Sequence, residues 1–259
     1  MLSGLDRLLA PAPDPARVAW LREHVYAHRG RHGGRLIENS PGAFAAAIDA
    51  RLGIECDVQA SADGRAIVFH DAELDRLTEE SGAVAERLAS QFTGIVLRGT
   101  TDRIPTLRDL LAQVRGRVPL LIEVKSRSGR TASALCRAVR DDLAGYRGEH
   151  AVMSFDPSVA HWFSRHAPET LRGLVVTEAN ARTPVGALRR RIALWRAQAD
   201  FLAYDVRDLP SRFAAAQRAR GFPLLTWTVS TAVLFERAKS CADGPIAENQ
   251  GLAAALESH

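Results

Sequence analysis

Short apolar runs alternate with helical stretches along most of the chain. Nine of the runs have the length and composition of strands: 25–27, 53–58, 66–69, 119–124, 151–155, 171–177, 201–206, 223–229 and 243–247. Most stretches between them are helical in pattern, and capping residues mark several starts at Asp14-Pro15, Ser40-Pro41, Asp156-Pro157 and Thr106 with Asp109. Gly53 is expected to end a helix over 41–52. The pattern predicts an α/β protein.

Nine strands are one more than an eight-stranded parallel barrel needs. Residues 59–65 are too few for a parallel crossover, which takes a dozen residues or more, and they contain the hairpin signal Asp63-Gly64. The strand at 66–69 should therefore run antiparallel to the strand before it. The other eight strands, joined mostly by helices, predict a (β/α)₈ barrel rather than a doubly wound sheet.

The chain is long enough for one barrel domain, which we place at residues 25–259, after an N-terminal extension over 1–24 with helical character. Residues 71–103 form the only long connection between predicted strands and helices. On the active face of a barrel, such a segment is either a lid that selects the leaving group or a helix, over about 84–92, that packs beside the barrel.

The composition of the chain limits which binding partners and which cellular location we expect for the protein. No apolar stretch approaches the roughly 20 residues of a membrane span, and the N-terminus lacks the apolar region of a signal peptide. We therefore expect no stable membrane insertion and a cytoplasmic location. A net charge of +4 without a basic run argues against nucleic-acid binding. Cys56, Cys136 and Cys241 match no disulfide or zinc pattern and are expected to be reduced core thiols. The oligomeric state stays open.

Ionisable side chains stand near the ends of the predicted strands, where burial is costly unless they are paired, bind a metal or act in a cleft. Glu55 and Asp57 are two positions apart and face one side of their strand, and Glu123 and Lys125 repeat this arrangement. Three carboxylates at the active rim of a barrel need a cation, and oxygen ligands favour Mg²⁺ or Ca²⁺. The alternatives are a solvated acidic pair and an ordinary ion pair.

His28 and His70 each end a predicted strand. A histidine there is often an ordinary core residue, but an imidazole near pH 7 also gives or takes a proton readily. Beside a carboxylate metal site, Arg29 and Lys125, the two histidines suit phosphoester hydrolysis. The cations neutralise the phosphoryl oxygens, one histidine deprotonates the nucleophile and the other protonates the leaving oxygen.

Eight motifs follow one another along the chain: His28-Arg29-Gly30, Glu38-Asn39-Ser40, Glu55-Cys56-Asp57-Val58, Val68-Phe69-His70-Asp71, Ile104-Pro105-Thr106-Leu107, Ile122-Glu123-Val124-Lys125, Ser154-Phe155 and Trp227-Thr228-Val229. As a set they resemble the glycerophosphodiester phosphodiesterase family. The resemblance implies a (β/α)₈ barrel that hydrolyses small glycerophosphodiesters to an alcohol and glycerol 3-phosphate with a divalent metal. It also implies that His28 and His70 are the acid and the base, in an order left open, and that Glu55, Asp57 and Glu123 are the metal ligands.

The same resemblance assigns the substrate contacts. It implies that Arg29 and Lys125 bind phosphate and that Trp227 lines the pocket. Glu38 and Asn39 would support these groups or touch the substrate, and a role for Glu38 in organising the loop after the first strand is equally open.

Two other functions remain in view. A phospholipase D-like enzyme on the same barrel would act on lysophospholipids or sphingolipids, and exposed apolar residues on 71–103 would favour it, although that segment is mostly polar. A non-catalytic binder of phosphate ligands would not need both histidines and all three carboxylates. A zinc hydrolase is disfavoured because the chain has no His-x-His pair.

Overall fold

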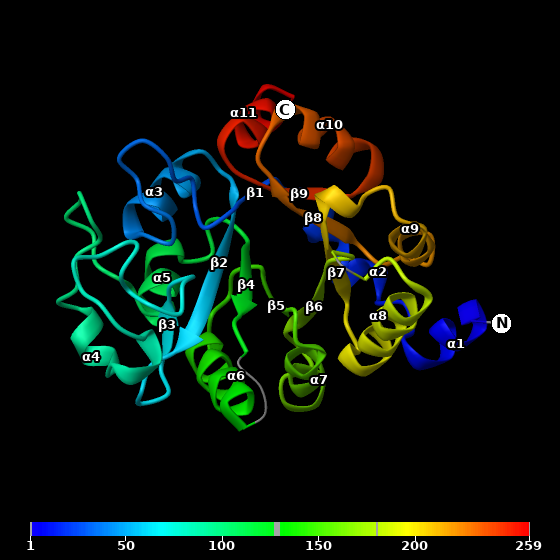
Figure 1. The fold of residues 1–259 in the computed structure, drawn as a ribbon, viewed down its shortest axis with the longest axis horizontal. Helices are drawn as coiled ribbons and strands as arrows, with labels where there is room; N and C mark the ends of the chain where they lie inside the picture. The colour runs from blue at the N-terminus through cyan, green and yellow to red at the C-terminus, as the bar shows by residue number, and fades with distance from the viewer. Residues whose placement is uncertain (1, 127–129, 180, 259) are drawn as a thin grey trace. The chain divides into compact units, whose positions relative to one another are not determined.

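Parallel strands joined by helices make up most of the structure, a computed structural model that describes residues 2–126, 130–179 and 181–258. The chain divides into two units (Figure 1). One unit is Tyr26–His150, and the other combines Met1–Val25 with Ala151–His259.

The unit Tyr26–His150 is built around the long strand β2. Strands β1 and β4 each pair with β2 in the parallel sense, whereas β3 pairs with β2 in the antiparallel sense. The turn before β3 contains Gly64 with φ +76°, a conformation suited to glycine. The elements are β1 (Tyr26–Ala27), α3 (Pro41–Asp49), β2 (Gly53–Ala60), β3 (Ala66–Val68), η2 (Val84–Glu86), α4 (Ala89–Phe92), α5 (Leu107–Val114), β4 (Leu120–Val124) and α6 (Arg130–Leu143).

From β5 onward, the other unit alternates strands with helices. Its strands pair in parallel in the order β5, β6, β7, β8 and β9. The elements are α1 (Leu2–Leu9), α2 (Pro15–Val18), η1 (Ala19–Arg22), β5 (His150–Ser154), α7 (Pro157–His166), β6 (Leu171–Val176), α8 (Pro184–Ala197), β7 (Phe201–Asp205), η3 (Val206–Asp208), α9 (Arg212–Arg218), β8 (Leu224–Val229), α10 (Ala232–Cys241), β9 (Gly244–Ala247) and α11 (Asn249–Glu257).

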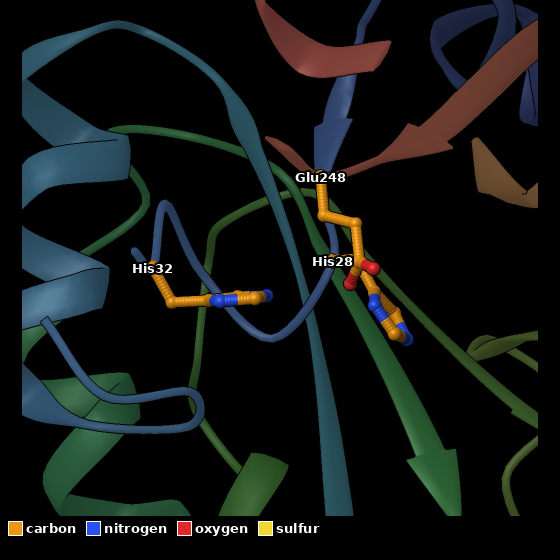
Figure 2. A group of neighbouring side chains, drawn as sticks. All are labelled: His28, His32 and Glu248. Atoms are coloured by element: carbon orange, nitrogen blue, oxygen red, sulfur yellow. The ribbon is translucent and has the colours of Figure 1, made fainter. Parts of the chain in front are cut away.

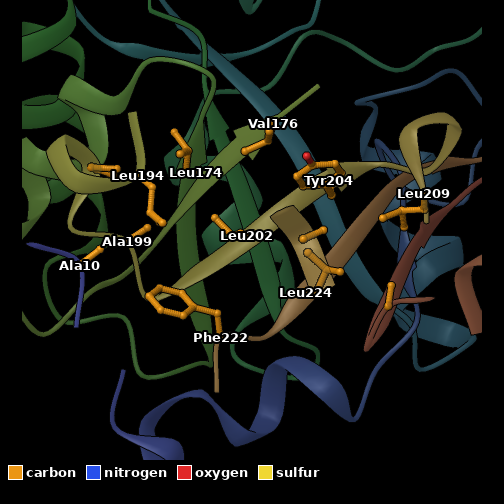
Figure 3. Packing of buried hydrophobic residues seen from close by; sticks show 14 residues of the cluster. Ala10, Leu174, Val176, Leu194, Ala199, Leu202, Tyr204, Leu209, Phe222 and Leu224 are labelled. Atoms are coloured by element: carbon orange, nitrogen blue, oxygen red, sulfur yellow. The ribbon is translucent and has the colours of Figure 1, made fainter. Parts of the chain in front are cut away.

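Strands and helices of this second unit enclose a continuous apolar core (Figure 3). Leu202 and Leu224 come from neighbouring strands, Leu194 comes from α8, and Phe222 stands just before β8, and all four side chains are buried. The N-terminal segment belongs to the same unit, because the buried Asp6 of α1 accepts a hydrogen bond from the Trp195 indole on α8. The division into an extension and one domain at residue 25 stays a prediction.

Most predicted element boundaries agree with the structure to within one or two residues, and the helix starts are confirmed. Asp14, Ser40 and Asp156 each cap a helix through the side chain, and Thr106 and Asp109 form the expected capping box. No helix among the described residues is both long enough and apolar enough to cross a bilayer.

The predicted role of Gly53 was wrong. The helix α3 ends at Asp49, and Gly53 instead opens β2. A Cβ atom on Gly53 would lie 2.5 Å from the ring of Tyr26, so the close approach of β1 and β2 requires glycine here. The prediction of three core thiols was wrong for Cys241, which is only half-buried at the end of α10, whereas Cys56 and Cys136 are buried.

The long connection 71–103 has a small core of its own. Instead of one helix over 84–92 it contains the short turns η2 and α4. Buried apolar residues of the connection pack with residues next to it, and together they are Ile67, Phe69, Leu74, Val84, Phe92, Ile95, Leu97 and Ile104. Leu88 and Val96 are exposed. The connection is therefore a packed segment of its unit.

Substituting Gly53 by alanine tests the close packing of β1 and β2. We expect Gly53→Ala to lower the free energy of unfolding by about 1–3 kcal/mol, because the added methyl group overpacks the site against Tyr26. Gly94→Ala is the control, since its Cβ would meet no atom closer than 3.6 Å. Urea unfolding of both variants measures the difference, and equal stabilities would contradict this account.

Candidate active site

Three carboxylates come together on one face of β2 and β4. Asp57 is paired with Glu123 in the strand register, and Glu55 precedes Asp57 by two residues and so faces the same side. Their exposed fractions are 1% for Glu55, 1% for Asp57 and 8% for Glu123. One oxygen of each lies within 4.8 Å of the others. This carboxylate cluster, Glu55, Asp57 and Glu123, could hold a metal ion.

The loop after β1 carries His28 and Arg29 to the cluster. Figure 2 shows His28 and His32 in this loop. The His28 Nε2 atom is 4.0 Å from Glu55 Oε2. Arg29 has a left-handed backbone with φ 54°, and its N–H donates to the same Glu55 oxygen at 3.1 Å. Because a left-handed conformation costs a non-glycine residue about 1–2 kcal/mol, the surrounding contacts must hold it.

Asn39 orients Asp57. The Asn39 amide Nδ2 donates to Asp57 Oδ2 at 2.9 Å, and its Oδ1 accepts from the Asp57 N–H at 3.3 Å. The Asn39 N–H donates to the Arg29 carbonyl, which helps hold the left-handed loop. Both ends of the buried amide are thus used within the protein, which makes Asn39 a support for Asp57.

Two cations lie against the cluster. The Lys125 Nζ atom is 2.9 Å from Asp57 Oδ1 and 2.6 Å from Glu123 Oε1. The Arg29 Nη1 donates to Glu38 Oε1 at 2.7 Å, and its Nε lies 3.1 Å from Asp57 Oδ2. That Nε is buried and its N–H is not aligned for a hydrogen bond with any described residue, although the charges are in contact.

Burial and mutual repulsion set the pKa values of the cluster. Burial raises the pKa of Glu55 well above its ordinary value, and the charges of Asp57 and Glu123 raise it further. Burial also raises the pKa of Glu123 against the attraction of Lys125. For Asp57 burial acts in the same direction, but Lys125 and Arg29 outweigh it and lower the pKa. Asp57 is therefore the most firmly ionised of the three.

His70 follows β3 and is held by Asp71, which belongs to one of the sequence motifs but was given no role there, and through it by Arg76, which no motif contains. The His70 Nδ1 atom lies 2.8 Å from Asp71 Oδ1. The Arg76 guanidinium donates hydrogen bonds both to Asp71 and to Glu38. Since Asp71 directly follows His70, their adjacency could have suggested this pairing, whereas nothing local to Arg76 marks it.

The net charge of the side chains at the site would be balanced by a divalent cation. Among the described residues, the side chains in contact here include five carboxyl groups and three permanent cations: Glu38, Glu55, Asp57, Asp71, Glu123, Arg29, Arg76 and Lys125. Full ionisation of these groups would give a net charge of −2, which burial and repulsion oppose at Glu55 and Glu123 and which a divalent cation would balance. The donors of the cluster are all oxygen, as Mg²⁺ or Ca²⁺ prefers. The residues present fit such a metal.

Trp227 lies in the other unit, on β8. Its indole Nε1 donates to the Ala203 carbonyl at 2.9 Å, and its ring meets Phe155 edge to face at 5.3 Å between centroids. The side chain is half-buried. Its predicted place in the substrate pocket stays a prediction.

Comparison with known proteins bears on this site. A sequence model of the glycerophosphoryl diester phosphodiesterase family matches residues 28–247. A protein of Mycobacterium tuberculosis named "probable glycerophosphodiester phosphodiesterase 2" is 33% identical over 219 residues, 78% of each chain. The chain belongs to this family.

Solved structures of phosphodiesterases have the same fold as this chain. A phosphodiesterase from Oleispira antarctica in complex with its product sn-glycerol-3-phosphate has a TM-score of 0.78 at 19% identity, covering 91% of this chain and 97% of the other. A glycerophosphodiester phosphodiesterase from Parabacteroides distasonis has a TM-score of 0.72 at 19% identity, covering 91% and 95%.

These comparisons confirm two predictions. The fold is a (β/α)₈ barrel with one further strand outside the ring of eight, and the chain is an enzyme of the phosphoric diester hydrolase class that acts on glycerophosphodiesters.

The contact between Arg76 and Asp71 should lower the pH at which the Asp71 carboxyl group titrates. The Arg76 hydrogen bonds lower the pKa of Asp71 from 3.8 to about 2, against the effect of burial and with help from His70. A lowered pKa stabilises the folded state above about pH 3.8, and this contribution is lost as pH falls through about 2. Carboxyl ¹³C NMR should show this midpoint, and Arg76→Ala should move it back toward 3.8. A midpoint near 3.8 in the unaltered enzyme would contradict the contact.

Proposed function

We propose that this enzyme releases glycerol 3-phosphate from glycerophosphodiesters by general acid and base catalysis at His28 and His70, with Mg²⁺ or Ca²⁺ held by Glu55, Asp57 and Glu123. The observation that carries the proposal is the buried carboxylate cluster, with Arg29 and Lys125 against it, His28 at 4.0 Å from Glu55, and His70 held by Asp71. A structural relative holds sn-glycerol-3-phosphate as its product, which supports the same product here.

The metal would occupy the oxygen cluster. Burial and mutual repulsion already make ionisation of Glu55 and Glu123 unfavourable, so a bound divalent cation would relieve the repulsion that the strand register creates. When bound, such an ion neutralises charge on the phosphoryl oxygens of the substrate.

Arg29 and Lys125 would bind the phosphate. Arg29 Nε is a buried donor without an aligned acceptor, and Lys125 keeps its positive charge because Asp57 and Glu123 raise its pKa despite burial. A phosphoryl oxygen would complete the hydrogen bonding of the guanidinium, which suits planar, bidentate contact with phosphate. Glu38 and Asn39 would act by orienting Arg29 and Asp57.

His28 and His70 would transfer the protons. One accepts the proton of the nucleophile as its oxygen bonds to phosphorus, and the other donates a proton to the leaving alcohol oxygen as its P–O bond breaks. With the glycerol 2-hydroxyl as the first nucleophile the product is a cyclic phosphate, which water then opens to glycerol 3-phosphate. Each histidine lies near a different carboxylate: His28 Nε2 is 4.0 Å from Glu55 Oε2, and His70 Nδ1 is 2.8 Å from Asp71 Oδ1.

One observation favours the phospholipase D-like alternative. Leu88 and Val96 of the connection 71–103 are 50% and 41% exposed, and exposed aliphatic residues there would suit a lipid substrate. Phe92 and the other large apolar residues of the connection's small core are buried, so the exposed pair is a limited surface. Lysolipid and sphingolipid substrates therefore belong in the assay. A cytoplasmic location stays a prediction from the sequence.

The first test is release of glycerol 3-phosphate from a panel of glycerophosphodiesters with Mg²⁺, Ca²⁺ or Mn²⁺ and with chelator. We expect metal-dependent release that His28→Ala and His70→Ala each lower by about 10²- to 10⁴-fold, the usual contribution of general acid or base catalysis.

His161→Ala is the matched control, because His161 is exposed on α7 and lies outside the site. Full activity of either His28→Ala or His70→Ala would overturn its role. Turnover of lysolipids with none of glycerophosphodiesters would favour the alternative function.

The second test concerns metal affinity. Asn39→Ala should weaken binding of Mg²⁺ or Ca²⁺ by about 10- to 100-fold, because a residue that orients a metal ligand typically contributes that much. Asn249→Ala is the control, since Asn249 has a similar left-handed backbone with φ 50° against 56° for Asn39. Titration calorimetry measures both variants, and equal affinities would remove Asn39 from the metal site.

A further inference from the structure

Resting on the proposed role of His70, we propose that Arg76 and Asp71 are positioning residues that fix the orientation and the protonated nitrogen of His70. The two residues lie in the long connection, and no role was predicted for either from the sequence.

The contact to His70 determines its tautomer. The imidazole Nδ1 lies 2.8 Å from Asp71 Oδ1. Asp71 is ionised at neutral pH, so its carboxylate can only accept, and the proton of this hydrogen bond must stand on Nδ1. The neutral imidazole then presents Nε2 as its basic nitrogen, which leaves that atom for proton transfer.

Arg76 clamps Asp71 by a bidentate contact. Its Nε donates to Asp71 Oδ2 at 2.5 Å and its Nη2 donates to Asp71 Oδ1 at 3.0 Å. The backbone of the same segment is held from β2, because the Gln59 amide donates to the carbonyls of Phe69 and Asp71 at 2.8 and 2.6 Å. Side chain and backbone of Asp71 are thus fixed independently.

The other half of the Arg76 guanidinium reaches Glu38. Its Nη2 donates to Glu38 Oε1 at 2.7 Å, and its Nη1 donates to Glu38 Oε2 at 3.2 Å. Glu38 Oε1 also accepts from Arg29 Nη1. One guanidinium therefore joins the carboxylate that orients His70 to the carboxylate that orients Arg29, so that proton transfer and phosphate binding share one scaffold.

This arrangement assigns a role to the connection 71–103. The small apolar core anchors the connection, and Arg76 projects from it to the site. Because lysine offers a point charge rather than a planar fork, it could satisfy one of the two carboxylates but not both in this geometry.

The experiment compares Arg76→Ala, Arg76→Lys and Asp71→Asn with Arg87→Ala. Arg87 is the matched control, because its side chain is also partly exposed and its side-chain contacts, to Glu80 and the Ser81 carbonyl, lie within the same connection and away from Arg76. The readouts are kcat and KM for a glycerophosphodiester, and long-range ¹H–¹⁵N NMR of histidine-labelled enzyme, with His70 assigned by His70→Gln.

We expect Arg76→Ala and Asp71→Asn to lower kcat by about 10- to 100-fold with little change in KM, the size of effect that a small misplacement of a reacting group produces. The Nδ1–H form of His70 should dominate in the unaltered enzyme and lose its dominance in both variants. Arg76→Lys should recover part of kcat, and Arg87→Ala should leave kcat and the tautomer unchanged.

Two results would overturn the proposal: an Nδ1–H population that does not respond to Asp71→Asn or Arg76→Ala, or equal losses of kcat in Arg76→Ala and Arg87→Ala. Failure of the proposed function is a separate outcome. It would appear as full activity of His70→Gln, while the NMR readout would still decide whether Asp71 and Arg76 set the tautomer.

Discussion

The repulsion among three buried carboxylates is the constraint on which the site depends. Strand register places Asp57 beside Glu123, and the alternation of side chains places Glu55 on the same face. Burying like charges this close is unfavourable unless cations offset them. The surrounding residues supply this compensation. Asn39, Arg29 and Lys125 all contact Asp57, through an amide, a guanidinium and an ammonium group.

Arg29 and Lys125 face two kinds of anion that would compete for their charges: the carboxylates of the cluster and the substrate phosphate. In the absence of substrate they neutralise Asp57 and Glu123, and in the proposed reaction they bind phosphate. A divalent metal ion in the cluster would take over the first task and release both cations for the second. The left-handed backbone of Arg29 fits this division, because it commits the main-chain N–H to Glu55 while the guanidinium faces other acceptors.

The connection after β3 shows how a packed loop can support catalysis. Its apolar residues form a core with Ile67 and Phe69, so the segment does not depend on substrate for its structure. Such order is what a positioning residue requires, because a guanidinium on a mobile loop would lose conformational entropy at each contact. The connection therefore serves the site through Arg76 whether or not it also selects the leaving group.

Local sequence patterns determined the strands, the capped helix starts and the candidate charges, because periodicity, capping and hairpin chemistry act over a few residues. The same patterns missed the end of α3 and the reason for Gly53, which depends on the ring of Tyr26 one strand away. They also could not find Arg76, since its partners Glu38 and Asp71 are 38 and 5 residues distant. Tertiary structure alone decided these contacts, because the order in which distant segments meet is set by strand register and packing.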